Sequence, residues 1–288
     1  MTTSLLSGIT TRLTPITDTP ALDASVLIAH ILHKPRTWVA AHPELTLTRE
    51  QREQLDVLLA RLEAGEAFPY VLGHWEFFGM GFEITPDVLI PRPETELLVE
   101  KAIAWLQESP VRRTVADVGT GSGVIAISIA RYIPGVRVLA TDISHEALHV
   151  AKKNAIKFDV VDRMDFVQCD LLPHPQALSR QERGEGARTF DLICANLPYI
   201  PTEILRTLPV YGREPTLALD GGADGLQVTR RLLDIAPEWL ASNGMMLLEI
   251  EATLGPQAFE LACHLFSQAS IHLHQDLTGK DRLLEIRP

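Results

Sequence analysis

From Thr114 onward, short β-branched runs alternate with amphipathic stretches whose apolar residues recur at helical spacing. The order strand, helix, strand, helix, strand implies βαβ units, which build a mainly parallel sheet with right-handed crossovers. This part of the chain therefore predicts an α/β domain with a Rossmann-like sheet. The segments that carry the pattern are TVADVG, GVIAISIARYI, VRVLATDIS, HEALHVAKKNAIKF and MDFVQCDL.

The same alternation continues toward the C-terminus. FDLICANLPYI predicts a fourth strand and its exit, QVTRRLLDIAPEWLASNG a helix that ends at Gly244, and MMLLEIE a fifth strand. The last two runs, IHLHQDLT and DRLLEIRP, predict an antiparallel hairpin that turns at Gly279 and Lys280. The polar stretch 173–189 predicts a long surface loop.

The first part of the chain has a different pattern and predicts a small helical bundle over residues 1–72. One helix is expected at 22–33, and another begins at Thr48, where Gln51 completes a capping box, and stops at Gly65. The first helix is expected to have one apolar face, formed by Leu22, Val26 and Ala29. Asp18 and Thr19 are its possible N-terminal caps.

Residues 73–92 predict a linker built on a β-hairpin, because two aromatic-rich runs flank the glycines of HWEFFGMGFEIT. A helix follows in PRPETELLVEKAIAWLQE, with Pro93 in its first turn. Residues 93–288 are then the α/β domain.

Composition excludes several classes of protein. The formal net charge of -11 and the pI near 5.4 disfavour extensive nucleic-acid binding, which requires a basic face. No apolar run approaches the ~18 residues that span a bilayer, and the start lacks a basic region followed by an apolar core, so we expect no membrane association and a cytoplasmic location. The three cysteines form no CxxC pair and are expected to be buried apolar residues.

The first strand of the α/β domain runs into a glycine-rich turn, which lets a ligand approach main-chain amides near a helix N-terminus. Its glycines fall as GxGxG, whereas a dinucleotide pyrophosphate is bound by GxGxxG, whose third glycine position holds Val124 here. NAD is thereby disfavoured. The turn comprises Asp117, Gly119, Thr120, Gly121, Ser122 and Gly123.

Acidic residues end the next two strands. Asp142, with Ile143 beside it, is placed to accept hydrogen bonds from ribose hydroxyls. Asp170 can meet an adenine amino group, and Leu171 can cover the ring. The arrangement is similar to the S-adenosylmethionine pocket of class I methyltransferases. Two roles are equally possible for Asp117: it can cap the amides of its own loop, or it can contact the amino group of the cofactor's methionine part.

The exit of the fourth strand, ANLPYI, lies beside this pocket, at the edge where open α/β sheets bind ligands. Asn196 and the main-chain carbonyl of Leu197 can each accept one N–H of a substrate NH2 group, which directs its nitrogen toward a sulfonium methyl. Pro198 keeps the preceding residue extended. Tyr199 can stack on a planar amide or base. The alternative is an Asx-Pro turn with a buried tyrosine.

Nearly the whole chain resembles one family, the protein-(glutamine) methyltransferases of the HemK or PrmC type, which modify peptide-chain release factors. The block IPRPETE is the most specific, since generic methyltransferases lack it. Two departures are Leu197, where the family has proline, and LEIEATLG, where it has LEIG followed by Gln. Leu197 keeps the carbonyl but gives up ring rigidity. The resemblance is carried by GEAFPYVLGHWEFFG, LIPRPETELLV, DVGTGSG, TDIS with EAL, NLPYIP, EPTLALDGGADGL and DLTGKDR.

This resemblance implies a methyltransferase that converts S-adenosylmethionine to S-adenosylhomocysteine. Its substrate is the glutamine in the GGQ loop of a release factor, and the N-terminal bundle helps to recognise that partner. A monomer is expected. Asn196, Leu197, Pro198 and Tyr199 are the implied catalytic and substrate-binding residues. Cofactor binding is expected of Asp117, Gly119, Thr120, Gly121, Ser122, Gly123, Asp142, Ile143, Asp170, Leu171 and Asn196.

Other readings stay open at this point. NLPY also resembles the motif of ribosomal RNA adenine dimethyltransferases, so methylation of an adenine amine is the main alternative. A nicotinamide oxidoreductase and a non-catalytic adaptor are the others. His272 and His274 are expected to face solvent and bind no metal. Arg92 and Glu94 can form a surface ion pair. The family resemblance implies instead that their loop lies over the cofactor as part of the domain junction.

Overall fold

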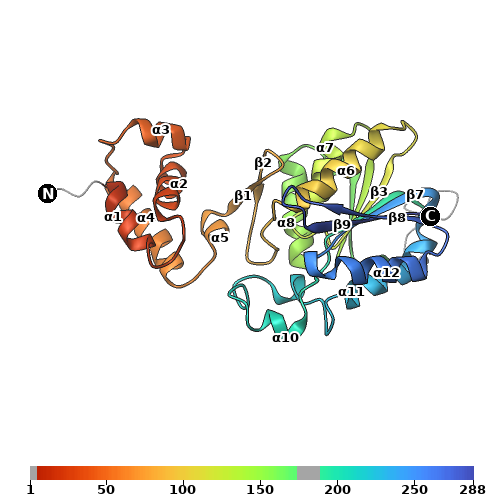
Figure 1. Ribbon diagram of the computed structural model, residues 1–288. Helices are drawn as coiled ribbons and strands as arrows, with labels where there is room; N and C mark the ends of the chain where they lie inside the picture. The colour runs from red at the N-terminus through yellow and green to blue at the C-terminus, as the bar shows by residue number, and fades with distance from the viewer. Residues whose placement is uncertain (1–4, 174–188) are drawn as a thin grey trace. The chain divides into compact units, whose positions relative to one another are not determined.

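The computed structural model describes residues 5–173 and 189–288. It divides the chain into two compact units, Met1–His74 and Trp75–Pro288 (Figure 1). Most of the stretch 173–189, for which a surface loop was expected, lies outside the described residues. No helix in the described ranges is long and apolar enough to cross a membrane.

The first unit is a helical bundle whose apolar side chains point inward. Leu13, Leu27, Ile28 and Leu59 are fully or almost fully buried in its core. Leu22 was expected on the inner face of its helix, but it is 44% exposed, because the packed face is centred on Leu27 and Ile28 instead. The helices are α1 (Leu5–Leu13), α2 (Pro20–Leu32), α3 (Arg36–Ala41), α4 (Arg49–Glu63) and α5 (Phe68–Leu72).

The expected capping box at the start of α4 is confirmed. The Gln51 amide N–H donates to the Thr48 hydroxyl at 3.2 Å, and the Thr48 N–H donates to the Gln51 side chain at 2.9 Å. Thr19, the residue before α2, makes no side-chain cap, so that part of the prediction is wrong. Its hydroxyl bonds to Asp23 in the first turn instead.

A two-stranded hairpin, β1 (His74–Phe77) and β2 (Met80–Glu83), precedes the second unit's sheet. That sheet has seven strands in the order β5-β4-β3-β6-β7-β9-β8. The first five in this order are parallel, while β9 runs antiparallel to both β7 and β8, as the sequence predicted. The strands are β3 (Thr114–Val118), β4 (Arg137–Asp142), β5 (Met164–Gln168), β6 (Phe190–Ala195), β7 (Leu240–Glu249), β8 (Ser270–Gln275) and β9 (Asp281–Arg287).

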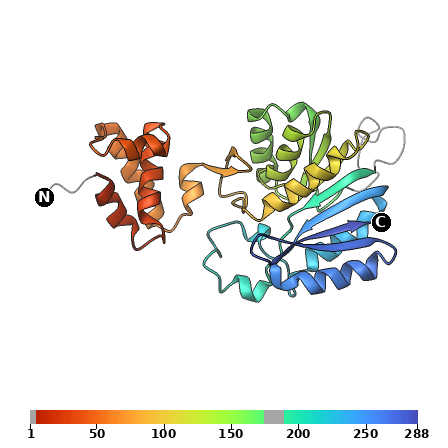
Figure 2. The same ribbon diagram turned by 45° about the horizontal axis from the view of Figure 1, so that its top comes forward.

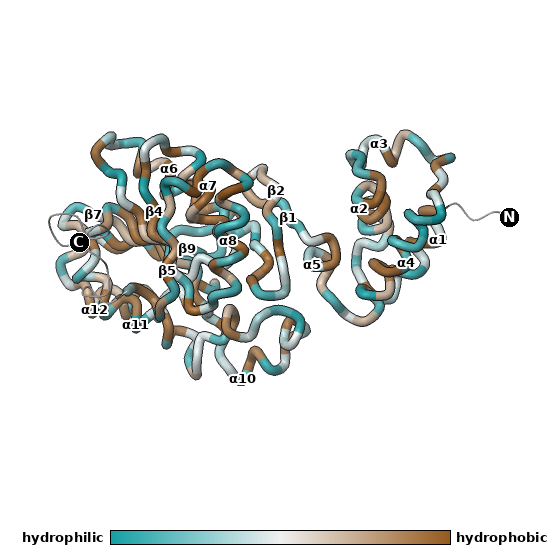
Figure 3. Tube along the Cα trace, turned by 180° about the vertical axis from the view of Figure 1, so that it is seen from behind, coloured by the Kyte–Doolittle hydropathy of each residue, from teal (hydrophilic) through white to brown (hydrophobic). Residues whose placement is uncertain are grey.

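Helices cover both faces of this sheet. Three of them pack side by side on one face and two pack together on the other (Figure 2). The backbone trace is mainly hydrophobic through the central strands, because a parallel sheet covered on both faces has no solvent-facing side (Figure 3). On the first face lie α6 (Thr95–Gln107), α7 (Val124–Tyr132) and α8 (His145–Lys157); on the second lie α11 (Gln227–Ile235) and α12 (Gly255–Leu265), while the short α10 (Thr202–Leu205) follows β6.

The helix predicted to run to Gly244 ends much earlier. Helix α11 stops at Ile235, and β7 begins at Leu240. Pro237 explains the difference, because it has no amide proton with which to continue the hydrogen bonds of the helix. The Trp239 carbonyl accepts from the Phe190 amide at 2.6 Å, which starts the pairing of β6 with β7.

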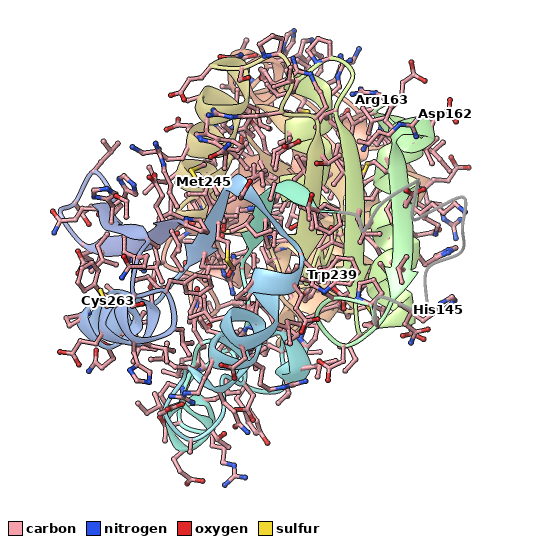
Figure 4. All side chains as sticks on the ribbon, turned by 90° about the vertical axis from the view of Figure 1, so that its right-hand side faces the viewer. His145, Asp162, Arg163, Trp239, Met245 and Cys263 are labelled. Atoms are coloured by element: carbon pink, nitrogen blue, oxygen red, sulfur yellow. The ribbon has the colours of Figure 1, made fainter. Side chains whose placement is uncertain are left out.

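Two further expectations about single residues are wrong. Pro93 lies before helix α6, which begins at Thr95, rather than in its first turn. Of the cysteines expected to be buried, Cys194 is buried, Cys169 is only partly buried, and Cys263 is exposed on α12 (Figure 4). All three cysteines are free thiols in the described chain.

Asn154 joins three separate segments of the second unit and is fully buried. Its Oδ1 accepts from the Glu83 amide at 2.8 Å, and its Nδ2 donates to the carbonyls of Glu83 at 3.0 Å and Ser122 at 2.9 Å. One side chain on α8 therefore fixes the hairpin strand β2 to the glycine-rich turn after β3.

We predict that Asn154→Ala lowers the free energy of unfolding by about 2–4 kcal/mol, because three main-chain polar groups lose their partner in a buried place. Urea denaturation measures this change. Lys153→Ala, an exposed neighbour on the same helix, is the control and should change stability by less than about 0.5 kcal/mol. Equal effects of the two substitutions would contradict the assigned role.

Candidate active site

The carboxyl ends of β3, β4 and β6 border a cavity of about 270 Å³. The loop before α6 and the segment before α11 supply its other walls. Because β3 pairs in parallel with both β4 and β6, the three strand exits meet at one edge of the sheet. This is the edge at which open α/β sheets bind their ligands.

The glycine-rich turn after β3 uses its own amides within the protein. The amides of Gly119 and Thr120 donate to the Thr141 carbonyl at 2.9 and 2.8 Å, and Gly123 donates to the Thr120 carbonyl. Gly121 donates to the Asp142 carboxylate at 2.9 Å. These amides are therefore not free to hold a pyrophosphate, which agrees with the argument against NAD drawn from the glycine spacing.

Two glycines of this turn have different reasons to be glycine. A Cβ on Gly123, whose φ is +85°, would lie 2.8 Å from Ile127 Cδ1 and 3.2 Å from Ala151 Cβ, so Gly123 allows α7 and α8 to pack closely. A Cβ on Gly121, whose φ is +56°, would meet nothing within 4 Å. Gly121 lines the cavity, whereas Gly123 does not, although both were expected to bind the cofactor.

Asp117 is fully buried beneath the turn and does not line the cavity. Its Oδ2 accepts from the Thr120 hydroxyl at 2.6 Å and from the Ala126 amide at 3.1 Å, so it supports the turn. Its Oδ1 has no hydrogen-bond partner among the described residues. Burial raises the pKa of this carboxyl to about 6, against the lowering effect of the two hydrogen bonds.

Asp142 ends β4 and lines the cavity. Its two oxygens accept from the Gly121 and Ser144 amides, each at 2.9 Å, which fixes the carboxylate in place. Burial raises its pKa, and the backbone hydrogen bonds oppose this. Each oxygen keeps a second lone pair, so the carboxylate can still accept from ligand hydroxyls.

The residues after β4 and β5 form a wall that is apolar with an acidic rim. Leu171 lines the cavity with a φ of +67°, a conformation that bulky residues rarely adopt, and the Thr141 hydroxyl donates to its carbonyl at 2.6 Å. Ile143 also lines the cavity. Asp170 lies on the rim and pairs with Arg231, which the sequence analysis did not single out.

The exit of β6 forms the opposite wall. Asn196, Leu197 and Pro198 all line the cavity. The Leu197 side chain is buried against Gly119, where a Cβ would lie 3.2 Å from Leu197 Cδ2. The Asn196 Nδ2 donates to the Thr95 hydroxyl at 3.1 Å.

Tyr199 was expected at the same wall but is not among the residues that line the described cavity. Its hydroxyl donates to Glu249 Oε1 at 3.4 Å, and burial raises its pKa well above the usual value. Its backbone packs against two glycines, since a Cβ on Gly221 would lie 2.7 Å from Tyr199 Cα and one on Gly225 would lie 2.5 Å from the Tyr199 carbonyl oxygen. The DGGADG stretch thus shapes the loop that follows Asn196.

The loop before α6 forms part of the cavity wall, in line with the expectation that the loop of Arg92 and Glu94 lies over the cofactor. Arg92 and Thr95 both line the cavity. Arg92 does not pair with Glu94 but with Glu214, at 2.5 Å, and the buried Glu214 also accepts from the Ile90 amide at 3.1 Å. Glu94 faces Arg282 at 3.6 Å instead.

Asp224 and the two C-terminal histidines have structural partners. Asp224 Oδ1 accepts from the Leu226 amide, but Leu226 itself is the N-cap of α11, so Asp224 stabilises the preceding turn rather than capping the helix. His274 bonds to Glu285 at 2.9 Å and His272 to Ser270 at 2.9 Å. In the described ranges, no group of three or more His, Cys, Asp or Glu side chains is arranged to hold a metal ion.

Sequence reasoning missed three polar residues of this region. Thr95 and Glu249 contact the predicted residues Asn196 and Tyr199, and Arg231 pairs with Asp170. Thr95 and Asn196 are separated by 101 positions, so no local pattern relates them. Glu249 is an acidic residue at the carboxyl end of a central strand, the signal that identified Asp142, and it could have been found by the same rule.

The cavity fits S-adenosylmethionine in its chemistry. The fixed Asp142 carboxylate can accept from ribose hydroxyls, Ile143 and Leu171 offer apolar surface to a base, and the space over Gly121 admits a ligand close to the main chain. Asp117 lies beneath the turn and does not line the cavity, so its part is to support the turn through Thr120 and Ala126. Fold and site together define a class I S-adenosylmethionine-dependent methyltransferase.

Comparisons with known proteins agree with this class. Residues 4–73 match the PrmC N-terminal domain, and residues 115–208 match a methyltransferase domain. The release factor glutamine methyltransferase of Moorella thermoacetica is 39% identical over 91% of this chain and 89% of its own. That of Bordetella pertussis is 39% identical over 92% of this chain and 93% of its own. The chain therefore belongs to the release factor glutamine methyltransferase family.

A solved structure supports the fold. The 16S rRNA N2 G1207 methyltransferase of T. thermophilus, in complex with AdoMet and guanosine, aligns with a TM-score of 0.51 and 18% identity. The match covers 74% of this chain and 49% of that one. At this identity, the likeness concerns the architecture of the sheet and its helices.

We predict that Asp117 makes stability depend on pH. Since burial raises its pKa from 3.8 to about 6, the folded protein holds a proton more tightly than the unfolded chain does. The associated stability is complete below about pH 4 and is lost as pH rises through about 6, on the order of 2–3 kcal/mol. Urea denaturation from pH 4 to 8 should show a shallower fall for Asp117→Asn than for the wild type; parallel curves would contradict the assignment.

We predict that Asp142→Ala weakens cofactor binding by at least about tenfold, because one or two hydrogen bonds to a charged group are lost, about 1.5–3 kcal/mol each. Calorimetric titration with S-adenosylhomocysteine measures the dissociation constant. Asp142→Asn is a second variant, which keeps one side-chain oxygen that can still accept the hydrogen bond from the Gly121 amide. Identical binding isotherms for wild type and Asp142→Ala would remove Asp142 from the site.

Proposed function

We propose that this enzyme transfers the methyl group of S-adenosylmethionine to the side-chain amide nitrogen of the glutamine in the GGQ motif of peptide-chain release factors. The main support for the proposal is the position of Asn196 and Leu197 at the wall of the cavity, in a chain 39% identical to a release factor glutamine methyltransferase over 91% of its length.

The difficulty of this reaction is the weak nucleophile, because the lone pair of an amide nitrogen is delocalised. Two acceptors, the Asn196 side-chain oxygen and the Leu197 carbonyl, each take one N–H of the substrate amide and so fix the direction of its lone pair. S-adenosylmethionine supplies an electrophilic methyl group and leaves as S-adenosylhomocysteine. The methylated nitrogen then loses its extra proton to solvent, so no strong base is required.

Leu197, which stands where the family has proline, can still hold its main-chain carbonyl in place as an acceptor. Pro198 keeps Leu197 extended, and the buried Leu197 side chain is held against Gly119. Burial of the side chain thus supplies part of the restriction that a proline ring would give. Tyr199, which does not line the described cavity, supports the loop that carries Asn196 through its hydrogen bond to Glu249.

The release factor is the partner, and the helical unit 1–72 contributes to its recognition. The expected linker 73–92 connects that unit to the catalytic domain 93–288. The enzyme acts as a monomer in the cytoplasm, where translation terminates. Its net charge of -11 disfavours extensive binding to nucleic acid.

The test is incubation with labelled S-adenosylmethionine, purified release factors and ribosomal RNA, followed by mass mapping of the products. Label on the GGQ glutamine is the expected result. Label on an adenine, or on neither substrate, would overturn the proposal.

We predict that Asn196→Ala lowers the turnover number at least about 100-fold, because the substrate nitrogen loses an orienting acceptor. Affinity for S-adenosylhomocysteine should fall by less than tenfold. Asn243→Ala, which removes an exposed asparagine of β7, is the matched control and should keep wild-type activity. Near-normal turnover in Asn196→Ala would mean that the orientation mechanism is wrong.

A further inference from the structure

Two segments that border the cavity are joined by an ion pair whose acidic partner is buried. Arg92, in the loop before α6, donates from Nη2 to Glu214 Oε1 at 2.5 Å. The Glu214 side chain is only 6% exposed, and its second oxygen accepts from the Ile90 amide at 3.1 Å. Both oxygens of one buried carboxylate therefore hold the same loop, which fixes the position of the Arg92 guanidinium.

The guanidinium of Arg92 has further donors that it can offer to the cavity. A guanidinium carries five N–H groups, and within the described part of the chain Arg92 uses one of its nitrogens, for the bond to Glu214. Its side chain is 34% exposed and lines the cavity. The planar N–H groups of arginine match the two oxygens of a carboxylate, so a ligand carboxylate is the group that this cation suits best.

The rest of the cavity wall is poorly suited to bind a carboxylate. The turn amides described above already donate within the protein. Among the described residues that line the cavity, Arg92 and Arg231 are the cations, and Arg231 pairs with an aspartate on the rim. Four carboxylates of the lining would repel a further negative charge, namely Asp87, Asp142, Asp170 and Asp220.

Arg92 belongs to the end of the cavity at which methyl transfer is proposed. Helix α6, which the Arg92 loop enters, packs against β6 and β7. Thr95, at the start of this helix, accepts from Asn196 Nδ2 at 3.1 Å. Arg231 pairs instead with Asp170, which follows β5, and two strands separate β5 from β6 in the sheet. The two cations thus mark different ends of the cavity.

We propose that Arg92, held in place by Glu214, binds the carboxylate of the methionine part of S-adenosylmethionine. With the base at Leu171 and the ribose at Asp142, the methionine part extends toward Asn196, the end to which Arg92 belongs. The inference rests on the proposed function, because that function assigns the reacting methyl group to the Asn196 end.

Glu214 is a positioning residue in this arrangement, since it acts on the cofactor through Arg92. Asp142 and Arg92 anchor the cofactor on either side of its sulfur, which limits the positions open to the methyl group. A ligand that lacks the carboxylate keeps the first anchor and loses the second. Arg92 should therefore discriminate between two ligands that differ in this group alone.

The first experiment is calorimetric titration with two ligands, in the absence of a release factor. S-adenosylhomocysteine has the carboxylate, whereas S-adenosyl-3-thiopropylamine lacks it and keeps the amino group. We expect Arg92→Met to weaken binding of S-adenosylhomocysteine at least tenfold and binding of the thiopropylamine less than threefold, because the charge-assisted contact exists only with the first ligand. Equal weakening of both ligands, or of neither, would overturn the proposal.

Arg213→Met is the matched control, because Arg213 is an exposed arginine beside Glu214 that is not among the residues lining the cavity. It should bind both ligands as the wild type does. A selective loss as large as that of Arg92→Met would show a general effect of charge and contradict the assigned contact.

A double variant tests whether the buried Glu214, left without its cation, causes the loss. Arg92→Met combined with Glu214→Gln removes both charges, and the glutamine keeps an oxygen for the Ile90 amide. We expect the same selective loss of at least tenfold for S-adenosylhomocysteine. Recovery of wild-type affinity in the double variant would mean that Arg92 acts only by neutralising Glu214, and would overturn the proposal.

The wild-type protein separates this inference from the function beneath it. No label on the release-factor glutamine by wild-type enzyme would overturn the proposed function. Label by wild type, together with equal affinity of the wild type for the two ligands, would overturn the carboxylate site alone. Unchanged ligand binding in Arg92→Met with a raised KM for the release factor would assign Arg92 to the substrate and also overturn it.

Discussion

The parallel pairing of β3 with both β4 and β6 is the constraint on which the site depends. It brings the exits of three strands to one edge, and the Gly119 and Thr120 amides, which follow the end of β3, continue the pairing by bonding to the Thr141 carbonyl of β4. The glycine-rich turn is therefore an extension of the sheet rather than a loose connection. Asp142 and Asn196 are held on either side of it by the same ladder.

In and around this site, burial shifts the pKa values of the carboxyl groups more than neighbouring charges do. Asp117, Asp142 and Glu249 all have raised pKa values with desolvation as the first cause. Arg92, the cation nearest in the covering loop, is paired with the buried Glu214. Of these three carboxyls only Asp142 lines the cavity, and together with Asp170 on the rim it suits a cationic sulfonium and an amino group better than a phosphate.

Sequence patterns predicted the sheet and the hairpins, because those features repeat at short range, and most of the site residues predicted with them line the cavity. The period of two or 3.6 identifies strands and helices, and the acidic strand ends of Asp142 and Asp170 follow from parallel topology. The prediction that a helix runs to Gly244 was wrong, because it gave too little weight to Pro237 within that stretch. The partners of Asn196 and Arg92 could not be predicted, because Thr95 and Glu214 meet them only after the chain has folded.

The position of Asn154 also bears on how the second unit folds. Its contacts with Glu83 span 71 positions, so they tie the hairpin strand β2 to α8 rather than to its neighbours in sequence. Contacts of such long sequence separation carry a loop-closure cost. The aromatic hairpin is therefore coupled to the α/β core, and its loss of contact with α8 would also free the glycine-rich turn from Asn154.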